Sequence, residues 1–144
     1  MTLSATRIAP GCDHLDDAAL LGRFERLEIA PSDFRHREHI RLAFALLRGA
    51  DFGEAAVRFR AALKRFAAAI GAPAKYHETL TWAYLALVAR CMDEGDYPNS
   101  FALLAAHPDL LDHQSGLLAR YYDVAAITAS PLARRVLVLP ERTR

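Results

Sequence analysis

The sequence predicts an all-α protein in which four longer helices form a bundle and shorter C-terminal helices pack across it. Three observations support this fold class. Apolar residues recur at helical spacing, prolines and glycines separate these stretches, and neither a β-hairpin signal nor an internal repeat interrupts them. The 144 residues suffice for one domain with a buried core. We expect a mobile leader at residues 1–13, a single helical domain at residues 14–140 and a tail at residues 141–144.

Each of the four longer helices is expected to have a continuous apolar face. Their predicted ranges are Asp16–Glu28, Arg35–Arg48, Phe52–Ile70 and Ala74–Met92. Pro31 and Gly49 are stop signals after the first two. Asp51 and Glu54 resemble a capping box at the start of the third helix, which ends before Gly71. Because the fourth helix is apolar on two flanks, we expect it to be central in the bundle.

The C-terminal third is expected to form shorter helices. They are predicted at Phe101–Ala106, at Asp112–Asp123 and after Ser130, which is a favourable N-cap residue. Pro131 then occupies the first position of the last helix, where its missing N–H costs nothing.

Composition and charge exclude several classes of protein. Hydrophobic residues make up 53% of the chain and charged residues 24%, which disfavours disorder. The net charge of +1 produces no field for binding nucleic acid or an anionic membrane. No segment approaches the roughly 20 continuous apolar residues of a membrane span, and Arg7 and Pro10 interrupt any signal-peptide pattern. Cys12 and Cys91 lack metal-type spacing. We therefore expect a cytoplasmic protein with reduced thiols and with neither a nucleic-acid nor a membrane partner.

Three histidines are expected to face the core. His36 and His39 are one helical turn apart on the apolar face of the second helix, and His77 lies on the inward face of the fourth. If these helices are neighbours, the three imidazoles converge on one internal pocket, with Thr81 and Tyr84 further along it. The other three histidines are expected to be exposed: His14, His107 and His113.

A bound divalent metal is one interpretation of this convergence. An unpartnered buried ring nitrogen costs about 1–3 kcal/mol, and a metal bound by His36, His39 and His77 satisfies all three rings. Three histidines and a water suit Zn²⁺, whereas imidazole with a carboxylate and open positions suits Fe²⁺. Glu78 is the better candidate for the carboxylate, although Glu38 and Glu78 are also spaced to form solvated ion pairs.

Two metal-free interpretations stay open. In the first, the pocket binds or transforms a small molecule. A histidine is then the general base, and Lys75 or Arg120 provides the positive charge. In the second, the histidines are structural and the protein is a non-enzymatic helical interaction module. The sequence has no P-loop, dinucleotide-binding or nucleophile-elbow motif, so it does not decide whether the protein is an enzyme. The basic residues of the third helix are expected to form a solvated face: Arg58, Arg60, Lys64 and Arg65.

Four short motifs of polar and aromatic residues stand out. They are F-x-H-x-x-H from Phe34, K-Y-H-E-T-x-T from Lys75, L-L-x-R-Y-Y from Leu117 and S-P-x-A-R from Ser130. Together they resemble a family of small uncharacterised bacterial all-α proteins without an established activity, over about residues 32–140. The resemblance implies that one set of residues belongs together: His36, His39, Lys75, Tyr76, His77, Thr79, Thr81, Arg120 and Tyr121. We therefore predict ligand contacts beside the histidines from Lys75, Tyr76, Thr81, Arg120 and Tyr121, with Arg134 as a further closing residue.

Overall fold

Helices and the turns between them make up the described chain. The computed structural model describes residues 11–141, and within this range it contains α-helices and 3-10 turns but no strand, which confirms the all-α prediction. The longer helices are α1 (Asp17–Glu25), α2 (His36–Gly49), α3 (Phe52–Ala69) and α4 (Glu78–Asp93). The shorter helices are α5 (Ser100–Ala106), α6 (Val124–Ala129) and α7 (Pro131–Arg135). The 3-10 turns are η2 (Pro31–Asp33), η3 (Pro73–Lys75), η4 (Pro108–Leu110) and η5 (Leu118–Arg120). None of the helices in this range is both long and apolar enough to cross a membrane.

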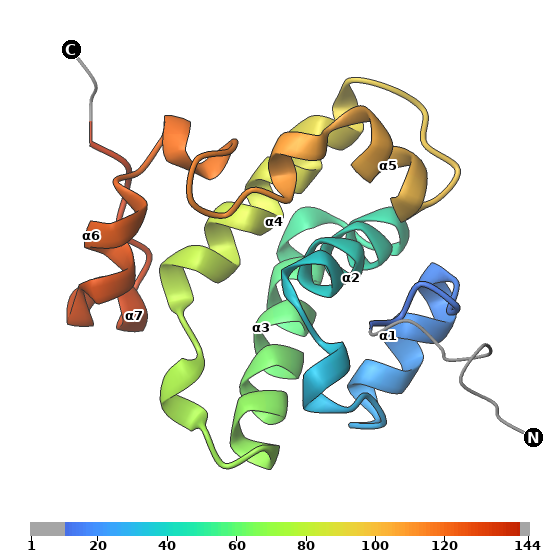
Figure 1. The fold of residues 1–144 in the computed structure, drawn as a ribbon, viewed down its shortest axis with the longest axis horizontal. Coiled ribbons are helices and arrows are strands. Elements are labelled where there is room, and N and C mark those ends of the chain that lie inside the picture. The colour runs from blue at the N-terminus through green and yellow to red at the C-terminus, as the bar shows by residue number, and fades with distance from the viewer. Residues whose placement is uncertain (1–10, 142–144) are drawn as a thin grey trace, which may run out of the picture.

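The helix α2 lies at the centre of the bundle (Figure 1). It packs against α1, α3, α4 and α5, whereas α4 packs against α2, α3 and α7. The expectation that the fourth helix is central therefore applies more closely to the second. The core between them is apolar and includes Phe24, Ile40, Phe44, Phe59 and Leu85, each at most 1% exposed. The shorter α6 and α7 lie together on the outer side of α4 (Figure 1).

The fourth helix begins later than predicted. Pro73 starts the 3-10 turn η3, and α4 starts only at Glu78. His77 has an extended backbone, and its Nδ1 accepts a hydrogen bond from the backbone N–H of Leu80 at 3.1 Å. His77 is therefore the N-cap of α4 and not an interior residue of it. Residues 74–77 were wrongly assigned to the helix because His77 is in phase with the stripe of Thr81 and Tyr84, although it only caps the helix.

The predicted helix at Asp112–Asp123 is wrong. This segment is a turn followed by η5, and the helix α6 begins after it with Asp123 as the N-cap. Gly116 is the reason: a Cβ at this position would collide with the carbonyl oxygens of Asp109 and Asp112. The tight turn that this close approach requires interrupts the helix. The prediction that Ser130 caps the last helix is confirmed, because its Oγ accepts from the N–H of Ala133 at 3.1 Å.

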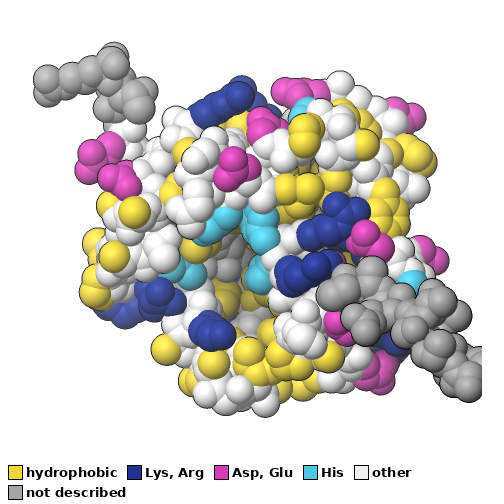
Figure 2. All heavy atoms as spheres, in the orientation of Figure 1, with side chains coloured by type: hydrophobic (Ala, Val, Ile, Leu, Met, Phe, Trp, Pro, Cys, Tyr) yellow, Lys and Arg dark blue, Asp and Glu magenta, His cyan; other side chains and the backbone are white. Residues whose placement is uncertain are grey.

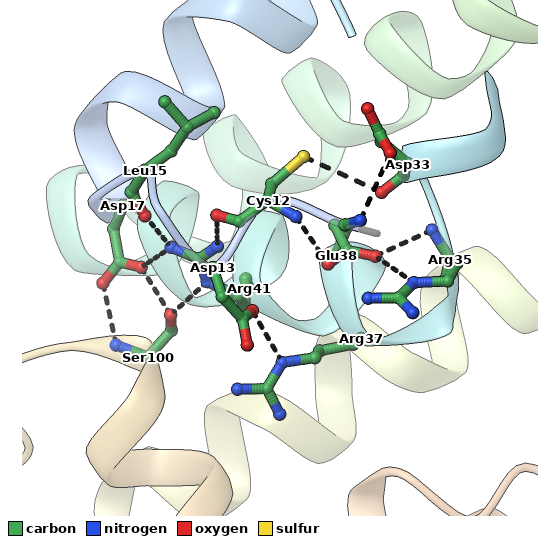
Figure 3. Close-up of polar contacts among 11 residues, drawn as sticks. Cys12, Asp13, Leu15, Asp17, Asp33, Arg35, Arg37, Glu38, Arg41 and Ser100 are labelled. Carbon is green, nitrogen blue, oxygen red and sulfur yellow. Dashed lines mark hydrogen bonds and ion pairs between the residues drawn. The ribbon is translucent and has the colours of Figure 1, made fainter. Parts of the chain in front are cut away.

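The predicted leader is only partly described. Residues 1–10, like residues 142–144 of the tail, lie outside the described residues. Cys12, by contrast, is only 2% exposed; its N–H donates to Glu38 Oε2 (3.4 Å) and its thiol donates to the carbonyl of Asp33 (3.7 Å) (Figure 3). The domain therefore begins before residue 14. Cys12 and Cys91 are both free thiols, as expected, although Cys12 was expected in the leader and is buried like Cys91.

The side chain of Arg41 connects three segments of the fold. It lies on α2, where the apolar pattern places it off the core face, yet it is fully buried. Its guanidinium donates to the carbonyls of Cys12 (2.8 Å) and Leu15 (2.6 Å). It also donates to Ser100 Oγ (2.9 Å) and to the carboxylate of Asp17 (3.2 Å), which in turn accepts from the N–H of Ser100 (Figure 3). The start of α1, the middle of α2 and the start of α5 thus share one buried ionic network.

Replacing Arg41 with alanine is expected to lower the free energy of unfolding by about 3–5 kcal/mol. The change leaves the largely buried carboxylate of Asp17 without its cation and removes a donor from the carbonyls of Cys12 and Leu15. Urea denaturation of the two proteins measures the difference. The control is Arg37→Ala on the same helix, which removes a surface ion pair with Asp13 and should cost at most about 1 kcal/mol. Equal losses in the two variants would contradict the role of Arg41.

Candidate functional site

A cavity of about 480 Å³ lies where the N-terminal ends of α2 and α4 face the C-terminal half of α3. Figure 2 shows histidine side chains gathered around a hollow on this face, with lysine and arginine side chains nearby. The polar lining residues are Arg35, His36, His39, Lys75, Tyr76, His77, Thr81, Tyr84 and His113. The three histidines predicted to converge therefore line one cavity, as do three of the predicted ligand contacts. Its volume is in the range typical of small-molecule sites.

The opposite wall of the cavity is apolar. Its residues come mainly from α3 and from the segment before α2: Phe34, Phe59, Leu63, Phe66, Ala67 and Ile70. The ring of Phe34 links the two walls, because its centroid lies 4.9 Å from that of Phe66 and 4.3 Å from that of His39. The cavity is therefore amphipathic, with an imidazole-rich side and an aromatic and aliphatic side.

The hydrogen bonds of His36 and His39 determine their tautomers. His36 Nε2 lies 2.8 Å from the carbonyl oxygen of Leu110, and His39 Nδ1 lies 3.3 Å from that of Arg35. Because a carbonyl oxygen only accepts, these two ring nitrogens carry the protons in the neutral rings. The other nitrogens, His36 Nδ1 and His39 Nε2, are therefore acceptors. No buried side-chain nitrogen or oxygen of the described residues lacks a partner, so both acceptors are accessible to solvent.

Both rings are held in the neutral form. Burial lowers the pKa of His39 from its ordinary value of 6.5 to about 4. Burial also lowers the pKa of His36, and the neighbouring ring of His113 acts in the same direction. At neutral pH the lining therefore presents two imidazole lone pairs and no imidazolium charge from these residues.

His77 is occupied by the backbone at both nitrogens. Its Nε2 donates to the carbonyl of Ile127 at 2.9 Å, and its Nδ1 accepts from Leu80 N–H as the cap of α4. Burial lowers the pKa of His77, and its partners match the neutral ring. The ring forms part of the cavity wall, but its polar atoms stabilise the fold.

Two histidines expected to be exposed are not. His113 lines the cavity, and its Nδ1 lies 2.7 Å from the hydroxyl of Tyr84. His107 is partly buried against Tyr97, with 2.9 Å between its Nε2 and the hydroxyl. Only His14 is exposed. His113 was missed because it follows η4 in an irregular turn, where helical periodicity carries no information about side-chain direction.

Three residues of the set implied by the family resemblance lie elsewhere. The side chain of Arg120 is 71% exposed and 3.8 Å from Asp109, and the hydroxyl of Tyr121 accepts from Arg90. Neither residue lines the cavity, because the turn at Gly116 changes the direction of this segment from that of a continuous helix. Thr79 is fully buried, and its hydroxyl bonds to the backbone near the C-terminus, at the carbonyl of Val136 and the N–H of Val138.

The donor set predicted for Zn²⁺ or Fe²⁺ does not fit a metal. His77 has no lone pair to offer. The carboxylate of Glu78 is turned away from the cavity toward Arg60 Nε (2.9 Å) and the hydroxyl of Tyr76 (2.5 Å). Glu38 is buried and accepts from two backbone N–H groups. Among residues 11–141 no group of three or more His, Cys, Asp or Glu side chains is arranged to hold a metal ion.

The lowered histidine pKa values predict that acid destabilises the protein. The unfolded chain takes up protons near pH 6.5, whereas the folded chain resists protonation of His39 down to about pH 4. The contribution of these rings to stability is therefore complete above pH 6.5 and is lost as the pH falls toward 4. Thermal unfolding measured from pH 7.5 to 4.5 tests this. His39→Phe should flatten the profile and His14→Phe should not; parallel profiles in both variants would contradict it.

Removal of His77 tests its structural assignment. His77→Ala is expected to lower the free energy of unfolding by about 1–3 kcal/mol, because α4 loses its N-cap and the Ile127 carbonyl loses one of its donors. His77→Asn, which retains a capping oxygen, should recover part of the loss. His14→Ala, the exposed control, should change it by at most about 0.5 kcal/mol. Chemical denaturation measures all three, and an unchanged His77→Ala protein would show that the cap is dispensable.

Comparisons with protein-family models, with curated proteins and with solved structures found no match to this chain. Its function therefore has to be inferred from the chemistry of the cavity.

Proposed function

We propose that the cavity binds a small organic acid that has an apolar body and a hydroxyl group. The observation that carries this proposal is the composition of the lining. It combines Arg35, Lys75 and uncharged imidazoles with an apolar wall, and none of its residues is an aspartate or glutamate. The proposal keeps the predicted histidine-lined pocket and omits the metal.

Charge favours an anion over a cation. Lys75 forms no ion pair or side-chain hydrogen bond with the described residues. Nε of Arg35 lies 3.5 Å from Oε1 of Glu38, and this carboxylate partly balances the charge of Arg35. The N-terminal ends of α2 and α4 also border the cavity, and the partial positive charge of a helix N-terminus adds to the same field. A carboxylate is thus favoured at the side of the cavity near Lys75.

The apolar wall is expected to supply most of the binding energy. Burial of about 100 Å² of apolar ligand surface contributes on the order of 2.5 kcal/mol, whereas an exposed ion pair contributes about 0–1 kcal/mol. Phe34, Phe59 and Phe66 provide a surface for an aromatic or branched aliphatic body. The charges near the entrance then select among molecules of similar shape and do not determine affinity alone.

The histidine lone pairs define a second polar group of the ligand. His36 Nδ1 and His39 Nε2 accept hydrogen bonds, so a ligand oxygen without a proton would be repelled there. A hydroxyl satisfies one of these acceptors, and a site built to bind a hydroxyl discriminates strongly against the analogue that lacks it. This supports a hydroxy acid over a simple carboxylic acid.

The alternative is a non-enzymatic interaction module with structural histidines. It is supported at His77, whose two nitrogens both serve the backbone. It is not supported at His36 and His39, which each leave one accessible acceptor. The proposal assigns binding and no reaction. The cytoplasmic location and the lack of nucleic-acid and membrane partners stay predictions of the sequence.

Three ligands of one shape test the proposal by isothermal titration calorimetry. Phenyllactate should bind more tightly than phenylpropionate, which lacks the hydroxyl, and phenylpropylamine should bind most weakly because Lys75 and Arg35 repel it. Lys75→Glu should weaken both acids about tenfold, which corresponds to about 1.4 kcal/mol. His39→Phe should remove the preference for phenyllactate.

The matched control is Arg120→Glu, which makes the same charge change outside the cavity and should leave all affinities unchanged. Equal binding of the acid and the amine, or equal weakening by Arg120→Glu and Lys75→Glu, would contradict the proposal.

A further inference from the structure

A second hollow, of about 290 Å³, lies between α3, η3 and α7 and is separate from the histidine-lined cavity except for the shared Tyr76. Its charged residues come from segments far apart in the sequence: Arg60, Lys64, Glu78, Arg134 and Arg135. We call it the basic cleft. Arg60 and Lys64 were expected to be part of a solvated face, whereas the fold places them opposite two arginines of the last helix.

The one carboxylate in the basic cleft is already neutralised. Arg60 Nε donates to both oxygens of Glu78, at 2.9 and 3.1 Å, and the hydroxyl of Tyr76 donates at 2.5 Å. Although burial acts to raise it, the hydrogen bonds from Tyr76 and Arg60 lower the pKa of Glu78 below its ordinary value. Glu78 is therefore ionised and fully engaged, and it leaves the other cations of the cleft unbalanced.

The other three cations have no carboxylate partner among the described residues. Arg134 donates to the backbone carbonyls of Ala74 (2.6 Å) and Thr128 (3.3 Å), which hold its guanidinium in place without cancelling its charge. Lys64 lies with its Nζ 5.6 Å from the ring centroid of Tyr76. The side chain of Arg135 forms no ion pair or hydrogen bond with residues 11–141. Three positive charges thus border one small concave surface.

We propose that the basic cleft binds the phosphate group of a small phosphorylated molecule. A phosphate monoester carries between one and two negative charges near neutral pH and offsets three cations better than a single carboxylate does. Guanidinium groups bind its oxygens in a bidentate manner, and a lysine adds a mobile point charge. Arg134 is fixed by the backbone before the ligand arrives, so ordering this side chain costs little on binding.

Titration of the full chain with inorganic phosphate and with glycerol phosphate tests the cleft, with sodium chloride at matched ionic strength as the reference. Both phosphates should bind and raise the melting temperature. The double variant Lys64→Gln, Arg135→Gln should weaken both at least tenfold. Neither side chain is hydrogen-bonded to the described protein, so the fold should persist, which circular dichroism checks.

The matched control is the double variant Arg23→Gln, Arg120→Gln, which removes the same charge outside the cleft and should leave phosphate affinity unchanged. No phosphate binding by the parent protein, equal losses in the two double variants, or exclusion of glycerol phosphate would each overturn the proposal. Binding of both phosphates that only the cleft variant weakens would support it.

Discussion

The buried guanidinium of Arg41 fixes the position of α2, and the candidate site depends on that position. A charge in the interior costs several kcal/mol unless it is paired and hydrogen-bonded. Here the cost is offset by two carbonyls, the hydroxyl of Ser100 and the carboxylate of Asp17. These partners come from the start of α1 and of α5. The network therefore forms only when these two segments have come together with α2, the helix that carries His36 and His39 into the cavity.

The sequence predicted the helices best where the apolar periodicity is long. The ranges of α2 and α3 were correct to within one residue, because 14 and 18 residues of regular spacing leave no competing register. The prediction from sequence failed where one local contact overrides the apolar periodicity. The side chain of His77 caps α4, which begins four residues after the predicted start, and the close approach at Gly116 replaces a predicted helix by a turn. Buried Arg41 was missed because its partners come from distant segments that periodicity does not describe.

The residues that line the cavity were partly predictable, because several of them lie on or beside helices with regular apolar spacing. His36 and His39 share the inward face of a regular helix, and Lys75, Tyr76 and Thr81 lie near the start of the helix packed against it. Arg120 and Tyr121 were placed wrongly because they follow an unforeseen turn. The roles of the ring nitrogens of His36 and His77 were not predictable, since they depend on the carbonyls of Leu110 and Ile127, which only the tertiary fold brings near.

Two backbone carbonyls of the C-terminal half of the chain, those of Leu110 and Ile127, help to determine the chemistry of the cavity. The carbonyl of Leu110 directs the proton of His36 to Nε2, and that of Ile127 does the same for His77. If η4 were shifted and this carbonyl removed, His36 could present an N–H donor in place of a lone pair, and the cavity would prefer a different ligand group. The polarity of the lining at His36 is thus set by the backbone path of η4, whatever side chain residue 110 carries. Because burial keeps the pKa of His36 and His39 low, this polarity persists at neutral pH, and the ligand hydroxyl that we propose is chosen to match it.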